Sequence, residues 1–109
     1  MKYLLLICDD GSLADAPEEE MDAMPWVAET TRNGTRLLGS RIRPAQDATT
    51  VRFKDGAPLI TDGPFAETKE QICGFDIIDC ADLDEAITIA AKHPVARYGM
   101  VEVRPFWTE

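Results

Sequence analysis

The order in which strand-like and helix-like segments follow one another constrains the fold of this chain more than any other feature. Runs rich in β-branched and aromatic residues, several of them alternating with polar residues, predict strands at residues 2–8, 36–43, 49–54, 57–61, 71–79 and about 100–106. Helical spacing follows Pro17 and Asp82. If residues 44–70 are set aside, the order is βαββαβ, the ferredoxin-like arrangement of two helices on one face of an antiparallel sheet. The predicted fold class is therefore α+β, ferredoxin-like βαββαβ with an inserted β-hairpin.

Local signals set the expected ends of the two helices. Proline suits the first turn of a helix, so the first helix is expected to begin near Pro17. Pro25 then predicts a kink or a break into two short helices. Asp82-Leu83-Asp84-Glu85 resembles a capping box in which Asp82 is the cap and Glu85 reaches back. His93-Pro94 is expected to end the second helix.

Residues 71–79 are predicted to be apolar on both faces of the sheet. One face carries Cys73, Phe75 and Ile77, and the other carries Ile72, Gly74 and Ile78. Two helices cover only one face, and leaving the other in water costs roughly 25 cal/mol per Å² of apolar surface. A second copy that packs its sheet against this one would remove that cost, so we expect a homodimer.

Size, charge and composition exclude several classes of protein. The 109 residues, of which 45% are hydrophobic, are expected to form one domain over residues 1–109. A net charge of −9 argues against nucleic-acid binding, which needs a basic face. No apolar run approaches the roughly 18 residues of a membrane span, and the first run is too short for a signal peptide. Three cysteines without metal or redox spacing fit a reduced, cytoplasmic setting, and no membrane, metal or cofactor is expected.

The charge is unevenly distributed along the chain. Residues 36–60 carry five bases and two acids, whereas residues 1–35 carry eight acids and two bases and residues 61–109 carry ten acids and four bases. The basic middle segment faces either an anion or the acidic neighbouring elements of its own fold.

The inserted segment, residues 44–70, is long against the roughly 2–5 residues of most hairpin loops. It holds the predicted hairpin, whose strands meet at the favoured two-residue turn Asp55-Gly56. The turn-forming Asp62-Gly63-Pro64-Phe65 follows, and then Ala66-Glu67-Thr68-Lys69-Glu70. With Thr50-Val51-Arg52, Gly74-Phe75, Asp84-Glu85-Ala86 and Val101-Glu102-Val103-Arg104-Pro105, these residues resemble the YCII-related family, specifically its DGPF-domain branch. The resemblance spans nearly the whole chain.

The resemblance implies a dimeric α+β barrel, in which two ferredoxin-like halves face each other through their sheets. It also implies a link to alternative sigma factors of the extracytoplasmic-function type. For the other branch of the family it implies lyase or isomerase chemistry at a His/Asp acid–base site, with the histidine on the first helix. That position falls near Ala23-Met24 here, where no histidine stands, so this mechanism is not carried over.

Asp62 is the candidate catalytic residue. A carboxylate in a turn beside a cleft can act as a general base, whereas its simpler role is an Asx turn that holds the loop. Arg52 and Arg104 either point into the barrel, where they could bind a carboxylate, or point outward into solvent. Lys69 either binds an anionic group or pairs with Glu70.

The remaining candidates for ligand binding are Trp26, Gly63, Pro64 and Phe65. Trp26 either roofs a pocket or fills the core. Gly63 and Pro64 shape the turn, and Phe65 is an anchor in the core or dimer interface rather than a ring that stacks on a ligand. Cys8 would need a base or cationic neighbour to act as a nucleophile, and the sequence shows none beside it.

Two functions of different classes remain open. The first is a small-ligand-binding or regulatory domain, with a small molecule or a regulatory protein as its partner and a role in sigma-factor-type transcription regulation. The second is a lyase or isomerase that acts on a small anionic or aromatic compound, with Asp62 as the general base. We favour the first because the sequence shows no nucleophile or acid–base constellation.

Overall fold

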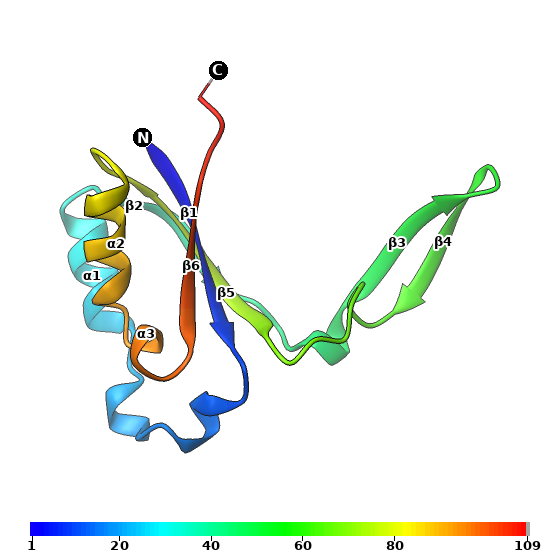
Figure 1. The fold of residues 1–109 in the computed structure, drawn as a ribbon, viewed down its shortest axis with the longest axis horizontal. Helices are drawn as coiled ribbons and strands as arrows, with labels where there is room; N and C mark the ends of the chain where they lie inside the picture. The colour runs from blue at the N-terminus through cyan, green and yellow to red at the C-terminus, as the bar shows by residue number, and fades with distance from the viewer. Residues whose placement is uncertain (109) are drawn as a thin grey trace.

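The computed structural model describes residues 1–108 as two antiparallel sheets and three α-helices (Figure 1). The larger sheet has the strand order β2-β5-β1-β6, formed by β1 (Lys2–Asp9), β2 (Arg36–Arg41), β5 (Gln71–Asp79) and β6 (Met100–Pro105). The smaller sheet is the hairpin of β3 (Thr49–Lys54) and β4 (Ala57–Asp62). The helices are α1 (Met24–Arg32), α2 (Leu83–Ala91) and α3 (Val95–Tyr98), with 3-10 turns η1 (Ser12–Asp15), η2 (Glu18–Glu20) and η3 (Ala45–Asp47). The ferredoxin-like α+β class with an inserted hairpin is confirmed.

The first helix begins later than the sequence predicted. Residues 17–23 hold only the 3-10 turn η2, and α1 starts at Met24 with Pro25 in its first turn. Proline is tolerated there because its missing N–H would have had no helical acceptor. The predicted helix is therefore wrong before Met24, since Pro25 opens a helix instead of interrupting one. The short helix α3 after Pro94 was not predicted.

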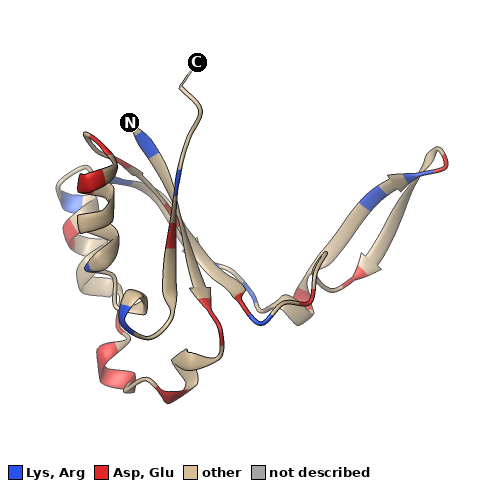
Figure 2. Cartoon of the chain, viewed as in Figure 1, with Lys and Arg blue, Asp and Glu red and all other residues tan. Residues whose placement is uncertain are grey.

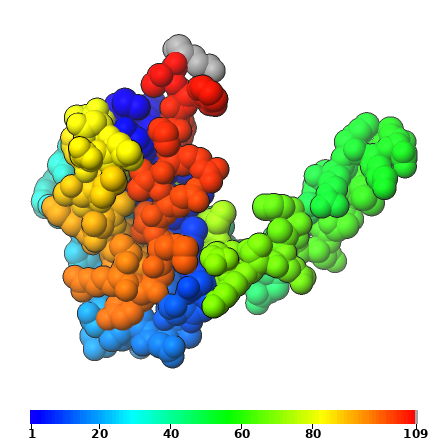
Figure 3. Space-filling model, in the orientation of Figure 1, coloured from blue at the N-terminus to red at the C-terminus, as the bar shows by residue number. Residues whose placement is uncertain are grey.

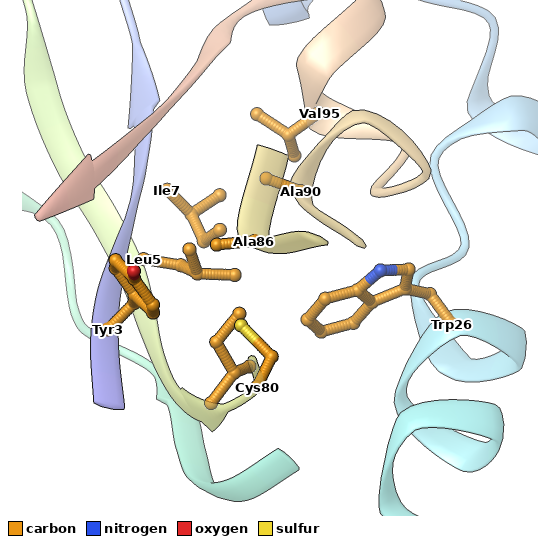
Figure 4. Packing of buried hydrophobic residues seen from close by; sticks show 9 residues of the cluster. Tyr3, Leu5, Ile7, Trp26, Cys80, Ala86, Ala90 and Val95 are labelled. Carbon is orange, nitrogen blue, oxygen red and sulfur yellow. The ribbon is translucent and has the colours of Figure 1, made fainter. Parts of the chain in front are cut away.

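One face of the large sheet packs against α1 and α2. Its fully buried side chains include Leu5 and Ile78, and the indole of Trp26 points from α1 into the same cluster (Figure 4). Trp26 Nε1 donates a hydrogen bond of 3.0 Å to the carbonyl of Ile89 on α2. The indole thus joins the two helices while its rings fill the core, which is the common use of a buried tryptophan.

A β-bulge changes the predicted alternation along β5. The register between β1 and β5 shifts between Ile7 and Cys8, which leaves Cys73 as the extra residue. Cys73 consequently packs against the core cluster, and the prediction that it shares a face with Phe75 and Ile77 is wrong.

The face of the sheet opposite the helices is largely apolar, as predicted, and the ion pair of Glu102 and Arg104 lies on it along the edge strand β6. Cross-strand register places five large side chains on it, which we call the open sheet face: Leu4, Leu6, Leu38, Phe75 and Ile77. Leu38 is 58% exposed, and no helix of residues 1–108 covers this face. The apolar surface that led us to expect a second copy is therefore present.

The hairpin of β3 and β4 projects from the globule as an arm, on the side away from the helices (Figure 1). Its turn residues Asp55 and Gly56 have φ values of 52° and 81°, as the favoured two-residue hairpin turn requires. The radius of gyration is 15.9 Å, whereas about 13 Å is expected for a compact domain of this length. We refer to residues 49–62 as the arm.

The capping box at α2 gives a first testable prediction. The Asp82 carboxylate accepts a hydrogen bond of 2.9 Å from the backbone N–H of Glu85, and the Glu85 carboxylate accepts one of 3.2 Å from Ala81 N. We expect Asp82→Ala to lower the free energy of unfolding by about 1 kcal/mol in urea titrations. The control Asp84→Ala removes a charge from the same turn without removing the cap and should lower it by only about 0.3 kcal/mol. Equal losses in the two variants would contradict the capping role.

Candidate functional site

A pocket of about 600 Å³ lies between the large sheet and the segment that runs from η1 into α1. Its lining is mainly apolar and includes Ile7 and Cys73 from the sheet, with Leu13, Met21 and Val27 opposite. This volume lies within the range of small-molecule sites in proteins. We call it the sheet–helix pocket.

The segment that covers the sheet–helix pocket is held by contacts with α3. The phenol of Tyr98 donates a hydrogen bond of 2.9 Å to Glu20 of η2, and Arg97 forms a 3.4 Å ion pair with the same carboxylate. The hydrogen bond to Glu20 raises the pKa of Tyr98, so the phenol stays protonated and keeps donating. The covering segment is therefore tied down on the side of the pocket remote from β2.

A buried ion pair supplies the central polar groups of the pocket. Arg36 Nε of β2 donates to Asp76 Oδ1 of β5 at 2.7 Å, with side-chain exposures of 17% and 7%. A charge-assisted hydrogen bond of this kind is short and strong, and it holds a buried carboxylate in place. The Nη groups of Arg36 make no other hydrogen bond within residues 1–108. They remain free to bind a ligand.

Gly39 leaves the room in which this ion pair forms. A Cβ atom at Gly39 would lie 2.0 Å from Asp76 Oδ1 and 2.5 Å from Arg36 Nη2. Both distances are far below van der Waals contact, so any side chain here would displace the pair. Gly39 is thus a positioning residue of the site.

His93 is the third polar group of the pocket. It is buried between α2 and α3, where its Nδ1 accepts a 3.1 Å hydrogen bond from the backbone N–H of Val95. The imidazole packs edge-on against Trp26 with ring centroids 4.8 Å apart. Burial lowers the pKa of His93, and the opposing charge of Asp76 offsets this only in part. The ring is therefore neutral at pH 7 and offers Nε2–H as a donor.

The charges that line the pocket sum to one positive charge. Arg36 and Asp76 neutralise each other, His93 is neutral, and the exposed Arg41 at the end of β2 adds a cation at the rim. This balance favours a ligand with a single negative charge on an otherwise apolar body.

The two cysteines near this end of the sheet are thiols. Burial raises the pKa of both Cys8 and Cys73, and a nearby carboxylate raises each further, that of Glu102 for Cys8 and that of Asp9 for Cys73. Cys73 Sγ lies 3.3 Å from the carbonyl of Ile7, to which it donates. A protonated thiol is a poor nucleophile, so the site does not activate either cysteine.

The structure places Asp62 away from the pocket. It ends β4 on the arm, is exposed, and its carboxylate accepts no hydrogen bond from residues 1–108, so the alternative of an Asx turn is not formed. Gly63 does shape the turn: its φ is 94°, its N–H donates to the carbonyl of Ala48 at 2.7 Å, and its carbonyl accepts from Thr50 Oγ1 at 2.7 Å. Pro64 follows it, half-buried.

The other predicted residues also lie outside the pocket lining. Arg52 and Lys69 are exposed, and Arg104 is exposed and paired with Glu102. Phe65 is 81% exposed, so it does not enter the core of its own chain. Trp26 is buried in the core, outside the pocket lining, and its ring packs edge-on against His93. Roles for these residues in ligand binding stay predictions.

The polar residues that do meet in the pocket were missed by sequence reasoning. Asp76 was the one weak signal, because an acidic residue within an otherwise apolar strand needs a buried partner. Nothing local in the sequence identified Arg36 as that partner, since forty positions separate the two.

Two kinds of feature are absent from residues 1–108. No three His, Cys, Asp or Glu side chains come together there in an arrangement that would hold a metal ion. Within the same residues, no helix has both the length and the apolar character needed to cross a membrane.

Comparison with known proteins agrees with the architecture. The family model of the YCII-related domain matches residues 1–108. An uncharacterised protein of Rhizobium meliloti (strain 1021) is 40% identical over 113 residues, which cover 96% of this chain and 91% of that protein. Among solved structures, the chain is similar to 5-chloro-2-hydroxyhydroquinone dehydrochlorinase of Burkholderia phenoliruptrix AC1100 in complex with 2,5-dihydroxybenzoquinone. That match has a TM-score of 0.59 and 14% identity, and covers 100% of this chain and 96% of the other.

The close approach at Gly39 gives a prediction for the ion pair. We expect Gly39→Ala to displace Asp76 or Arg36 and to lower the free energy of unfolding by about 1–3 kcal/mol, as overpacking of a filled site does. The NMR signal of the Arg36 Nε–H should shift in the same variant. Ser40→Ala, one residue along β2, is the matched control and should change stability by less than about 0.5 kcal/mol. If both variants behave alike, the space at Gly39 is not what holds the pair.

The lowered pKa of His93 gives a prediction of pH dependence. Because the folded protein binds this proton more weakly than the unfolded chain, whose histidine has the ordinary pKa of 6.5, protonation favours unfolding. The free energy of unfolding should therefore fall as the pH drops below 6.5, until the pH passes the pKa of the folded state. His93→Gln should remove this part of the dependence, and the difference between the two proteins should be constant above pH 7. His93 is the only histidine in the chain, so its imidazole NMR signals measure the folded pKa directly. A value above 6.5 would contradict the argument.

Proposed function

Because the chain belongs to the YCII-related family, we propose that it binds a small molecule in the sheet–helix pocket. The observation that carries the proposal is the buried ion pair of Arg36 and Asp76 in a pocket whose other walls are mainly apolar. Such a pair is costly to bury. A pocket that retains it, with guanidinium donors left free, is suited to recognising a polar group on a largely apolar ligand.

The geometry favours a flat, singly charged ligand. The apolar walls formed by Ile7, Leu13 and Val27 suit a ring, and the donors of Arg36 and His93 suit a carboxylate or phenolate oxygen. The dehydrochlorinase of the same fold holds 2,5-dihydroxybenzoquinone, a flat ring with acidic hydroxyl groups. That likeness is one of fold, and it supports the size class of the ligand by analogy.

A homodimer through the open sheet face is part of the proposal. The face carries large apolar side chains, among them Leu38 and Phe75, that no helix covers. Packing two such faces together would remove them from water, in agreement with the barrel that the family resemblance implies. The regulatory role, including the link to sigma factors, rests on the resemblance alone and would require that a second protein respond to ligand occupancy.

A second candidate function is proton transfer on a small anionic compound, as in a lyase or isomerase. The observation that favours it is the neutral imidazole of His93 beside Asp76 at the pocket. Because its Nδ1 accepts from the backbone N–H of Val95, the imidazole would act on a substrate through Nε2–H, as the donor to an oxygen that gains negative charge during the proton transfer. Asp62, which we first predicted to be the base, could serve this pocket only if another arrangement of the arm brought it there.

Binding can be tested with benzoate as the probe. We expect benzoate to shift the imidazole signals of His93 and the Nε–H signal of Arg36 in NMR titrations, and the neutral benzyl alcohol to bind more weakly. Arg41→Gln should weaken benzoate binding about fivefold, the effect of a partly exposed ion pair worth roughly 1 kcal/mol. Arg43→Gln is the matched control, because Arg43 lies two residues along the chain, pairs with Asp47 and is outside the pocket lining. If millimolar benzoate leaves His93 and Arg36 unshifted, the pocket is not a site for anionic rings.

A further inference from the structure

The arm presents an apolar side that its own chain leaves in solvent. Strand pairing aligns Val51 with Ile60 and Phe53 with Pro58, so these four side chains share one side of the hairpin. Phe53 is 74% exposed, Val51 64% and Ile60 63%. We call this set the apolar side of the arm. The opposite side carries Arg52 and Lys54. Figure 2 shows both basic and acidic segments along this hairpin.

An uncovered hairpin of this kind is not expected to persist alone. Isolated two-stranded hairpins are marginally stable in water, and they need a third strand or a packing surface to stay folded. Neither β3 nor β4 pairs with any strand but the other. The space-filling view shows the arm standing off from the body, with an open wedge between them (Figure 3). Residues 1–108 therefore provide no packing surface for the apolar side of the arm.

The chain exposes more surface than a compact monomer of its mass, and the excess is large enough for a dimer interface. The solvent-accessible area is 7788 Å², whereas about 6,000 Å² is expected for a compact monomer of 12.1 kDa. The excess is therefore roughly 1,800 Å², and a standard interface removes about 800 Å² from each partner. One chain thus exposes more than enough additional surface for a stable interface with a copy of itself.

We propose that the arm is exchanged between two copies of the chain, each arm packing its apolar side on the body of the other copy. A two-fold axis makes this self-complementary, because each chain supplies one arm and one open sheet face. The body of the second copy would enter the wedge of Figure 3, with its open sheet face toward the first sheet and the rim of its sheet toward the arm.

Charge at the arm does not oppose a second copy as the occupant. Arg52 and Lys54 are balanced within the arm by Asp55 and Asp62, so residues 49–62 carry no net charge, and the net charge of −9 lies on the rest of the chain. A neutral arm can therefore pack on the acidic body of another copy without adding to the repulsion between the two bodies.

The exchange goes beyond the proposed ligand binding and does not depend on it. It also differs from a dimer made by the open sheet faces alone, because such a dimer leaves the arms in solvent. A test must therefore report contacts of the arm itself.

Site-specific photo-crosslinking tests the exchange directly. Phe53 is replaced by the photoreactive aromatic residue benzoylphenylalanine, which preserves an apolar ring at this position, and the full chain is irradiated. Mixing isotope-labelled and unlabelled chains before irradiation identifies crosslinks between copies by mass. We expect a covalent dimer whose crosslink maps to the body of the other copy. The same replacement at Arg52, on the opposite side of the arm, is the matched control and should crosslink far less.

Sedimentation of variants gives a second, independent measurement. The double variant Phe53→Ser, Ile60→Ser should weaken dimerisation at least tenfold, whereas Leu59→Ser on the other side of the arm should leave it within about twofold. A dimer that persists in the double variant, with no crosslink from position 53, would overturn the exchange and leave a dimer of sheet faces. A wild-type monomer, or crosslinks to another protein only, would also overturn it. Benzoate titration of the same variants reports the pocket separately.

Discussion

A sheet that is apolar on both faces, in a chain with helices enough for only one, is the constraint on which this structure depends. β1 and β5 lie in the middle of the sheet and send Leu5 and Ile78 to the helices and Leu6 and Phe75 to the other side. Leu5 and Ile78 are fully buried on the helix side. The open sheet face and the arm are the two surfaces left over. A second copy of the chain, as we propose, would cover both surfaces without any further component.

The sequence predicted correctly those features that depend on interactions between residues close together in the chain. The Asp82 cap, the Asp55-Gly56 turn and the bounds of β3 and β5 follow from hydrogen bonds and dihedral preferences within a few residues. The start of α1 did not follow, because a proline is compatible with both the interruption and the opening of a helix. The bulge opposite Ile7 could not be predicted either. It depends on pairing between two distant strands, and it moves Cys73 from one side of the sheet to the other.

The candidate site shows the same contrast between local interactions, which the sequence predicts, and contacts between distant segments, which it does not. Sequence reasoning placed chemistry in the Asp62-Gly63-Pro64-Phe65 turn, since polar residues in a conspicuous turn suggest a site. The structure gives Gly63 a backbone role there and leaves Asp62 in solvent. The groups that converge are Arg36, Asp76 and His93, which come from β2, β5 and the connection between α2 and α3. Apart from the acidic Asp76 within an apolar strand, none of them stands out in its own stretch of sequence. Only the antiparallel pairing of β2 with β5, and a glycine opposite Asp76 in that pairing, bring the charges within hydrogen-bonding distance.

The pocket and the arm follow one another along the chain. They differ in whether contacts within the same chain hold them in place. β2 ends at Arg41 on the rim of the pocket, and Ile42 donates its backbone N–H to the carbonyl of Cys73 at 3.1 Å before the chain leaves the sheet. This bond fixes the rim against β5 whatever the arm does beyond it. All polar groups of the pocket therefore belong to one chain and are held by that chain's own hydrogen bonds. The apolar side of the arm has no such internal support. Ligand binding is consequently expected of a single chain, whereas order in the arm is expected only of the assembly. A dilute, monomeric sample should separate the two, retaining the shifted imidazole of His93 while the arm loses its strand pairing.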